Sequence, residues 1–270
     1  MNELELRLGR QRAAGKKALI PFITAGDPDL DTTSAILDAL SDVASACELG
    51  IPYSDPIADG PVIQASYTRA LEAGTTLEQI ARMLACRPTP SALPLIWMVS
   101  YAIIYRQGLD SFVARARQSG VSGLIVPDLL FEESDTLQAV CEREHLALVQ
   151  LITPTTTSER AQRIAAASRG FLYYVSVAGI TGERNALPAE LCDNVARVRE
   201  WSDVPVCVGF GISRPEQARQ VAEVADGVVI GSSLVRELSG DWGGSETSAV
   251  ERIRQKALAF AAALGHPQAD

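Results

Sequence analysis

Histidine is scarce in this chain, which contains only His145 and His266. A metal site rich in histidine and a Ser-His-Asp triad therefore have almost nothing to draw on. The five cysteines show no pattern of a disulfide or metal site, because their number is odd and no two of them form a C-x-x-C pair. This pattern disfavours a disulfide framework and a zinc knuckle, and it favours a reducing cytoplasm.

Long apolar runs are missing as well. No segment is long and apolar enough to span a bilayer, and residues 1–20 hold no apolar core of signal-peptide length. We therefore expect a soluble cytoplasmic protein. Its net charge of −9 and pI near 4.9 would repel nucleic acid and anionic membranes. Hydrophobic residues make up 47% of the 270 residues, which is enough for a sizeable core.

A G-x-G-x-x-G motif does not follow the first predicted strand, which weakens a dinucleotide-binding interpretation. What the chain does contain is eight short apolar runs, each followed by turn residues and then by helical periodicity. The predicted strands are Ala18–Thr24, Ala46–Leu49, Pro94–Val99, Gly123–Val126, Ala147–Leu151, Phe171–Val175, Val206–Gly209 and Gly227–Ile230.

Strict alternation of strands and helices predicts a parallel sheet, and eight units favour a closed α/β (β/α)₈ TIM barrel over an open sheet. We expect one barrel domain over residues 1–270, preceded by an extra helix at roughly residues 2 to 13. The active site of such a barrel lies at the C-terminal ends of the strands. The loops after the strands are therefore where chemistry is expected.

The second of these loops carries two acids. Glu48 stands near the end of the second strand, and Asp59 follows in a loop stiffened by Pro52, Pro56 and Pro61. Two carboxylates in one pocket are suited to proton transfer, because their surroundings can separate their pKa values. The alternative is structural: an internal ion pair for Glu48 and a helix cap for Asp59.

Glycine-rich segments follow the seventh and eighth strands. Gly209 and Gly211 stand just past one strand, and Gly231, Ser232 and Ser233 open a helix after the other. These two loops often bind phosphate in this fold through backbone N–H groups. The alternative is that the glycines only make tight turns.

The helix after the seventh strand has a predicted start. Ser213 is a plausible N-cap, Pro215 falls in the first turn, and Glu216 occupies the capping-box position.

The long sixth loop, "SVAGITGERNALP", is typical of a lid that closes over a ligand, although an ordinary surface loop fits too. Tyr173, in the strand before it, could hydrogen-bond a substrate or belong to the core. Five residues could wall an apolar pocket: Phe22, Val99, Ile125, Phe210 and Val229. Together these features predict a barrel enzyme for an apolar or aromatic body joined to a phosphate, and they indicate no metal or redox cofactor.

Seven strings carry a resemblance to a known family. "PFITAGDPD", "ELGIPYSDPIADGPVIQ", "RALEAG", "TPTT", "GFLYYVSVAGITG", "VPVCVGFGIS" and "IGSSLV" resemble, in order, the tryptophan synthase alpha chain family. The resemblance implies retro-aldol cleavage of indole-3-glycerol phosphate to indole and glyceraldehyde 3-phosphate. It also implies a tryptophan synthase beta chain as partner, in an alpha2beta2 heterotetramer of tryptophan biosynthesis.

The resemblance also implies roles for individual residues. Glu48 would be the general acid and base, Asp59 would stabilise positive charge at the indole nitrogen, and Tyr173 would lie near the glycerol portion. Thr181 would be the lid residue that meets Asp59. The implied phosphate contacts are Gly182, Gly211, Gly231 and Ser232.

Three residues depart from the family pattern near the rim that faces the beta chain. Ile103 and Ile104 stand where the family has Asn-Pro, and Leu130 replaces a proline. Harmless drift explains these changes, but so does an altered beta-chain interface or a stand-alone lyase that releases free indole. Two further alternatives are a non-catalytic regulatory subunit that binds a phosphate ligand and another phosphate-binding barrel isomerase.

Overall fold

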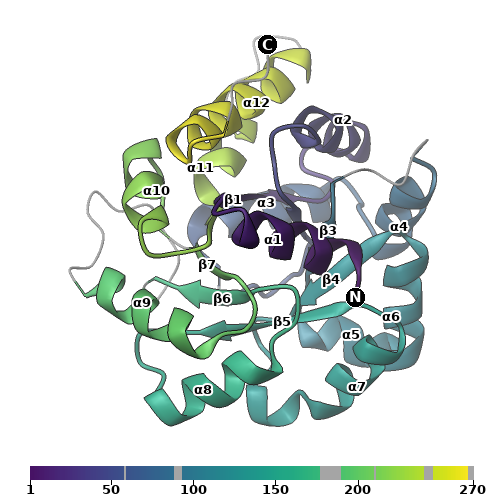
Figure 1. The fold of residues 1–270 in the computed structure, drawn as a ribbon. Helices are drawn as coiled ribbons and strands as arrows, with labels where there is room; N and C mark the ends of the chain where they lie inside the picture. Colours follow the sequence, from purple (N-terminus) through teal and green to yellow (C-terminus); the bar gives the residue numbers. More distant parts are fainter. Residues whose placement is uncertain (58, 88–92, 177–189, 210, 240–245, 267–270) are drawn as a thin grey trace.

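Eight parallel strands follow one another around a closed barrel in chain order (Figure 1). The computed structural model describes residues 1–270 except 58, 88–92, 177–189, 210, 240–245 and 267–270. The strands are β1 (Ala18–Thr24), β2 (Cys47–Gly50), β3 (Leu95–Met98), β4 (Val121–Ile125), β5 (Ala147–Ile152), β6 (Leu172–Val175), β7 (Val206–Gly209) and β8 (Gly227–Ile230). The predicted (β/α)₈ TIM barrel is therefore confirmed.

The helices surround this barrel, as Figure 1 shows. They are α1 (Glu3–Ala13), α2 (Leu30–Leu40), α3 (Pro61–Glu72), α4 (Leu77–Ala85), α5 (Tyr101–Gln107), α6 (Leu109–Gln118), α7 (Asp135–Arg143), α8 (Ser158–Ala167), α9 (Leu191–Trp201), α10 (Pro215–Ala222), α11 (Ser232–Val235) and α12 (Glu246–Ala263). Short 3₁₀ helices span Phe131–Glu133 and Arg236–Leu238. None of the helices in the described part of the chain has both the length and the apolarity that a membrane crossing needs.

Alternation along the strands separates two hydrophobic clusters. Side chains that point outward pack against the helices, with Trp97 and Phe112 in an edge-to-face contact 5.8 Å between ring centroids. Side chains that point inward fill the barrel and include Phe22, Ile125 and Val229. Since neighbouring residues of a strand face opposite sides, a one-residue change in register would exchange these two sets.

The predicted extra helix is α1, which crosses the N-terminal end of the barrel (Figure 1). Its start is fixed by a capping box: Glu5 N donates to Asn2 Oδ1 at 3.1 Å, and Asn2 N donates to Glu5 Oε2 at 2.8 Å. Leu4 and Leu8 are buried and join the cluster inside the barrel. The helix therefore closes the end of the barrel opposite the expected active site.

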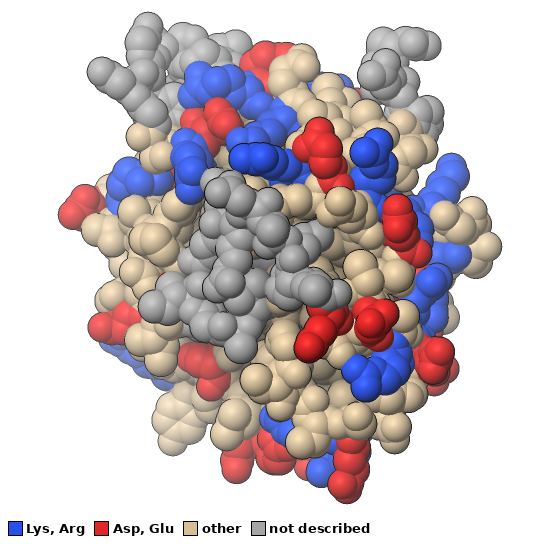
Figure 2. All heavy atoms as spheres, turned by 90° about the vertical axis from the view of Figure 1, so that its left-hand side faces the viewer, with Lys and Arg blue, Asp and Glu red and all other residues tan. Residues whose placement is uncertain are grey.

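Charged side chains of both signs are interspersed on the face of the molecule that Figure 2 shows. Several of the exposed ones pair: Arg160 donates to both oxygens of Glu132 at 2.7 and 2.9 Å, and Arg254 contacts Asp42 in the same way. Such exposed pairs contribute little to stability, typically about 0–1 kcal/mol each. The fold is held mainly by the two apolar clusters.

Candidate active site

Glu48 lies inside the barrel at the centre of β2. Its register partners are Phe22 on β1 and Ile96 on β3, and its side chain is 1% exposed. Its Oε1 atom has no hydrogen-bond partner among the described residues. Burial, and then the charge of Asp59, raise the pKa of Glu48 well above its usual range. Burial therefore favours the protonated form of Glu48, and its Oε1 atom is available to a ligand.

Asp59 is held in the loop between β2 and α3. Gln64 Nε2 donates to the carbonyl oxygens of Asp59 at 2.8 Å and Pro56 at 3.2 Å, and Asp59 N donates to Pro56 O at 3.1 Å. Burial and then the charge of Asp128 raise the pKa of Asp59 to about 6. The charge of Asp59 is one of the causes that raise the pKa of Glu48, so an ionised Asp59 favours a protonated Glu48. The two side chains therefore favour a state with one carboxylate beside one carboxylic acid.

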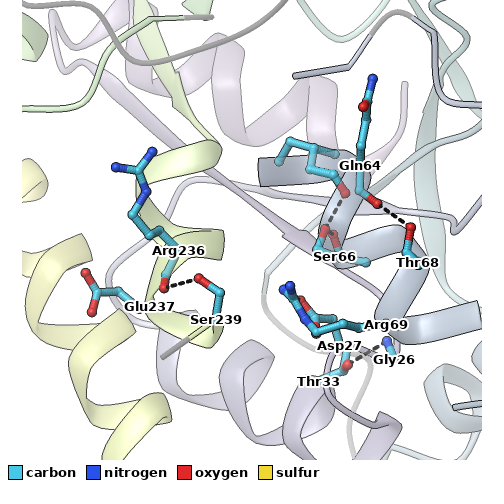
Figure 3. A network of polar contacts seen from close by, with 12 residues as sticks. Gly26, Asp27, Thr33, Gln64, Ser66, Thr68, Arg69, Arg236, Glu237 and Ser239 are labelled. Carbon is cyan, nitrogen blue, oxygen red and sulfur yellow. Dashed lines mark hydrogen bonds and ion pairs between the residues drawn. The ribbon is translucent and has the colours of Figure 1, made fainter. Parts of the chain in front are cut away.

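A buried ion pair fastens α3 to the loop after β1 (Figure 3). Arg69 Nε and Nη2 donate to the two oxygens of Asp27 at 2.8 and 2.6 Å, and Asp27 is fully buried. Beside it, Gly26 has a φ of 81° and donates its N–H to Thr33 Oγ1 at 2.9 Å. The pair thereby joins α3, the helix that follows the Asp59 loop, to the loop after β1.

The barrel mouth opens into a cleft between the loops that follow β2, β3 and β4. Asp59 lines it together with Val99, one of the residues predicted to wall an apolar pocket. The other lining residues are Ile51, Tyr53, Asp55, Pro56, Ile57, Tyr67, Met98, Ser100, Pro127 and Asp128. The cleft thus combines an apolar wall with acidic groups.

Tyr173 occupies the opposite side of the barrel interior, on β6. Its hydroxyl lies so close to Gly209 that a Cβ at that glycine would collide with it. Burial raises the pKa of Tyr173 well above its usual range, and the charges of Glu48 and Asp59 add to this effect. Burial therefore favours the protonated phenol, whose hydroxyl lies against Gly209 inside the barrel.

The three predicted apolar residues on β1, β4 and β8 also meet inside the barrel. Phe22, Ile125 and Val229 are at most 4% exposed and belong to the interior cluster. The fifth predicted wall residue, Phe210, lies outside the described residues.

The two glycine-rich loops lie at the same end of the barrel. Gly211 has a φ of 82°, and Gly231 stands directly before α11, which Ser232 begins. A Cβ at Gly231 would meet nothing closer than Phe22, at 3.7 Å, so packing does not require a glycine there. The remaining predicted ligand contacts, Thr181 and Gly182, lie outside the described residues together with the predicted lid.

Two cleft residues escaped the sequence reasoning. Tyr67 is on the same face of α3 as the buried Ile63, four residues earlier, which could have indicated that it points into the barrel. Asp128 lies in the loop after β4, three residues past the end of the strand, where active sites form. No group of three or more His, Cys, Asp or Glu side chains in the described ranges is arranged to hold a metal ion.

Comparison with known proteins gives many relatives. The family model of the tryptophan synthase alpha chain matches residues 8–264. A tryptophan synthase alpha chain of Rhodopirellula baltica is 49% identical over 261 residues, which cover 95% of this chain and 94% of the relative. That of Geobacter sulfurreducens is 48% identical over 222 residues, covering 82% and 84% of the two chains.

Solved structures agree with this result. Tryptophan synthase subunit alpha from Legionella pneumophila superposes with a TM-score of 0.88 at 34% identity, covering 98% of this chain and 99% of that one. A chain of the tryptophan synthase a2b2 complex of Pyrococcus furiosus gives 0.83 at 37% identity, covering 92% and 99%. Since the family model spans nearly the whole barrel and the relatives align over most of both lengths, the chain belongs to the tryptophan synthase alpha chain family.

Proposed function

We propose that this chain is a carbon–carbon lyase that cleaves indole-3-glycerol phosphate to indole and glyceraldehyde 3-phosphate. The observation that carries the proposal is a buried Glu48, whose pKa is raised by burial and by the charge of Asp59, in one site with Asp59. Family membership supplies the substrate, because the pair alone fits any reaction that needs an acid beside a carboxylate.

The chemistry begins with a proton that Glu48 gives to C3 of the indole ring. The ring then carries a positive charge centred on its nitrogen, and the Asp59 carboxylate stabilises that charge by accepting the N–H. The Glu48 carboxylate next takes the proton of the glycerol hydroxyl next to the ring. The bond between C3 and the glycerol carbon breaks, its electron pair restores the neutral indole, and the hydroxyl carbon becomes the aldehyde. Glu48 ends protonated, ready for another turnover.

The rest of the site would hold the substrate. Phe22, Val99, Ile125 and Val229 would surround the indole, and Tyr173 would hydrogen-bond the glycerol portion. The backbone N–H groups near Gly211, Gly231 and Ser232 would receive the phosphate. We extend the same assignment to Thr181, Gly182 and Phe210 from their place in the sequence motifs.

We further propose that the chain is a single domain that works in the cytoplasm with a tryptophan synthase beta chain, as alpha2beta2. The closed barrel formed by strands from Ala18 to Ile230 supports one domain. The five cysteines are free thiols, which is typical of a reducing compartment. The Pyrococcus furiosus relative, whose structure is described as that of an a2b2 complex, supports the partner.

The test is indole release from indole-3-glycerol phosphate by the purified chain, with and without a tryptophan synthase beta chain. We expect slow release that the beta chain accelerates. Fast release that ignores the beta chain would contradict the proposed partnership and favour a stand-alone lyase. Absence of release under both conditions, with substrate still bound, would refute the lyase and favour a regulatory subunit.

A further inference from the structure

A further cavity lies outside the barrel wall, between α8 and α9. These two helices pack side by side on the outside of the barrel (Figure 1). The cavity is lined by Ile152, Thr153, Pro154, Thr156, Ser158, Ala161, Tyr174, Asn194, Arg197, Val198 and Trp201. Among the described residues, none lines both this cavity and the cleft at the barrel mouth. The two places are therefore distinct.

The alternation of side chains along β6 separates this cavity from the active site. Tyr173 and Tyr174 are neighbours on the strand, but Tyr173 belongs to the cluster inside the barrel and Tyr174 to the outer one. Tyr174 is 1% exposed, whereas Arg197 is exposed. The cavity thus leads from the surface of α9 inward to a buried phenol on the outer side of the barrel wall.

The charge in the lining is positive. The Arg197 guanidinium donates to Asn194 Oδ1, and it forms no ion pair with a carboxylate in the described part of the chain. The acids nearest to the lining in sequence, Glu159 and Asp193, are exposed and do not line the cavity. Burial raises the pKa of Tyr174, and the Asn194 hydrogen bond and the Arg197 charge oppose this rise. The sign of this charge favours an anion as ligand.

Hydrogen-bond donors surround the same space. The hydroxyl oxygens of Thr153 and Thr156 lie 3.1 Å apart in the turn before α8, and Thr156 Oγ1 accepts from Thr153 N at 3.1 Å. Ser158 begins α8, a helix of 10 residues, and the N–H groups of a first turn have no partner within the helix. An arginine beside hydroxyls and a helix N-terminus is an arrangement suited to phosphate oxygens.

The size of the cavity limits the ligand. Its volume is about 40 Å³, and a single water needs about 10–15 Å³ of such space. The cavity therefore has room for about three waters, or for one small oxyanion in their place. The body of any larger ligand must stay in the solvent.

We propose that this cavity, the α8–α9 pocket, binds a phosphate group through the Arg197 guanidinium, the hydroxyls of Thr156 and Tyr174, and the N-terminus of α8. Inorganic phosphate and small phosphate monoesters share this chemistry, because only the phosphate has to enter. The site goes beyond the proposed reaction, since it lies on the other side of the barrel wall from Glu48.

The test uses Trp201, which lines the α8–α9 pocket. In protein labelled with fluorotryptophan, the ¹⁹F signal of Trp201 is the one that is missing from Trp201→Phe. We expect inorganic phosphate to shift this signal until it saturates, while chloride at the same ionic strength leaves it in place. A Trp201 signal that responds to phosphate no more than to chloride would overturn the proposal.

Arg197→Met tests the guanidinium itself. We expect the phosphate concentration at half-maximal shift to rise at least about tenfold, because a hydrogen bond between two charged groups is lost. Tyr174→Phe should raise it less, since only a neutral donor is removed. Arg117→Met, at an exposed arginine on α6 outside the pocket, is the matched control and should not change it. An unchanged midpoint in Arg197→Met would mean that phosphate acts from another site, and it would refute the pocket.

A second titration, with glycerol 3-phosphate, distinguishes the two sources of phosphate. Tighter binding than that of inorganic phosphate would identify a monoester as the ligand, and equal or weaker binding would identify inorganic phosphate. None of these measurements needs turnover, so they test the pocket even if the chain releases no indole. In turn, Arg197→Met should release indole at the rate of the unchanged chain, because Arg197 lies outside the active site.

Discussion

At the scale of single residues, the burial of Glu48 that suits catalysis also makes the stability of the fold depend on pH. The pKa of Glu48 in the folded chain is raised above its pKa in the unfolded chain. Its contribution to the free energy of unfolding is therefore fully present at pH values below the unfolded pKa. That contribution is lost as the pH rises through the folded pKa, because a buried charge must then form. An acid that is kept neutral for catalysis therefore weakens the fold at alkaline pH.

The variant Glu48→Gln tests both sides of this conflict. We expect kcat for indole release to fall at least about 100-fold, the lower end for general acid–base catalysis, while a substrate analogue that lacks the reacting hydroxyl still binds. Its Tm should match that of the unchanged chain near pH 4 and exceed it increasingly towards pH 9. Glu78→Gln, at an exposed site on α4, should leave activity unchanged and give no such pH trend. Near-normal turnover in Glu48→Gln would remove its acid–base role.

Asp128 exerts its effect on Asp59 through charge. The Asp128 carboxylate accepts hydrogen bonds from Ser100 Oγ at 2.6 Å and Tyr101 N at 2.8 Å, and it is exposed. Its negative charge is the second cause, after burial, of the raised pKa of Asp59. Asparagine at this position keeps an acceptor for Tyr101 N while it removes the charge.

In Asp128→Asn we therefore expect the pKa of Asp59 to fall below about 6. The acid limb of kcat/KM for indole release should move to lower pH, and the difference should shrink at high ionic strength because Asp128 is exposed. Asp135→Asn, at an exposed site on α7, should leave the limb in place. An unmoved limb in Asp128→Asn would mean that the charge of Asp128 does not reach Asp59.

At the scale of elements, the ion pair between Asp27 and Arg69 joins α3 to the loop after β1. Burial raises the pKa of Asp27 while the Arg69 guanidinium lowers it, so the carboxylate depends on its partner to remain charged. Removing one partner of a buried pair leaves an uncompensated charge, and the measured cost is about 3–5 kcal/mol.

We accordingly expect Arg69→Met to lower the free energy of unfolding in urea by about 3 kcal/mol, a value reduced only by the partial exposure of Arg69. Arg82→Met on α4 is the matched control, since its pair with Glu78 is exposed on both sides and should contribute less than about 0.5 kcal/mol. Equal losses in the two variants would show that the buried pair does not fasten α3.

The bounds of the strands could be predicted because the local pattern of apolar and turn residues determines them. The bounds of β1, β7 and β8 match the prediction, and the other strands agree to within two residues, because apolar runs and turns mark them. The start of α10 differs from the predicted one, because Arg214, not Ser213, is the N-cap and Gln217, not Glu216, holds the capping-box position. Gln217 Oε1 accepts from Ser213 N at 2.9 Å and from Arg214 N at 3.1 Å. Several neighbouring polar residues could cap this helix, and their placement against the barrel decides which one does.

The site was predictable in part for the same reason. Glu48 and Tyr173 stand on strands, so alternation places them inside the barrel. Tyr67 and Asp128 line the cleft from a helix and from another loop. Their distance from Asp59 in space depends on how three loops pack together, which no local pattern of residues contains.

At the scale of the whole molecule, two of the three departures from the family pattern pack with the outer apolar cluster. Ile104 is fully buried and Ile103 packs against the outer apolar cluster, so both side chains hold α5 against the rest of the molecule. Leu130 is different, because it is 64% exposed just after β4, at the same end of the barrel as the cleft. Exposed apolar side chains at such a rim are suited to the core of a protein–protein interface.

We therefore expect Leu130→Asp to weaken the acceleration of indole release by a tryptophan synthase beta chain while the rate of the chain alone stays the same. A charge buried in an apolar contact is costly, so the beta-chain concentration needed for half-maximal acceleration should rise at least about tenfold, equivalent to 1.4 kcal/mol. Leu6→Asp, on α1 at the opposite end of the barrel, should leave the acceleration unchanged. If both variants respond to the beta chain like the unchanged protein, the contact lies elsewhere than around Leu130; if Leu6→Asp alone loses the response, the partner binds the closed end of the barrel.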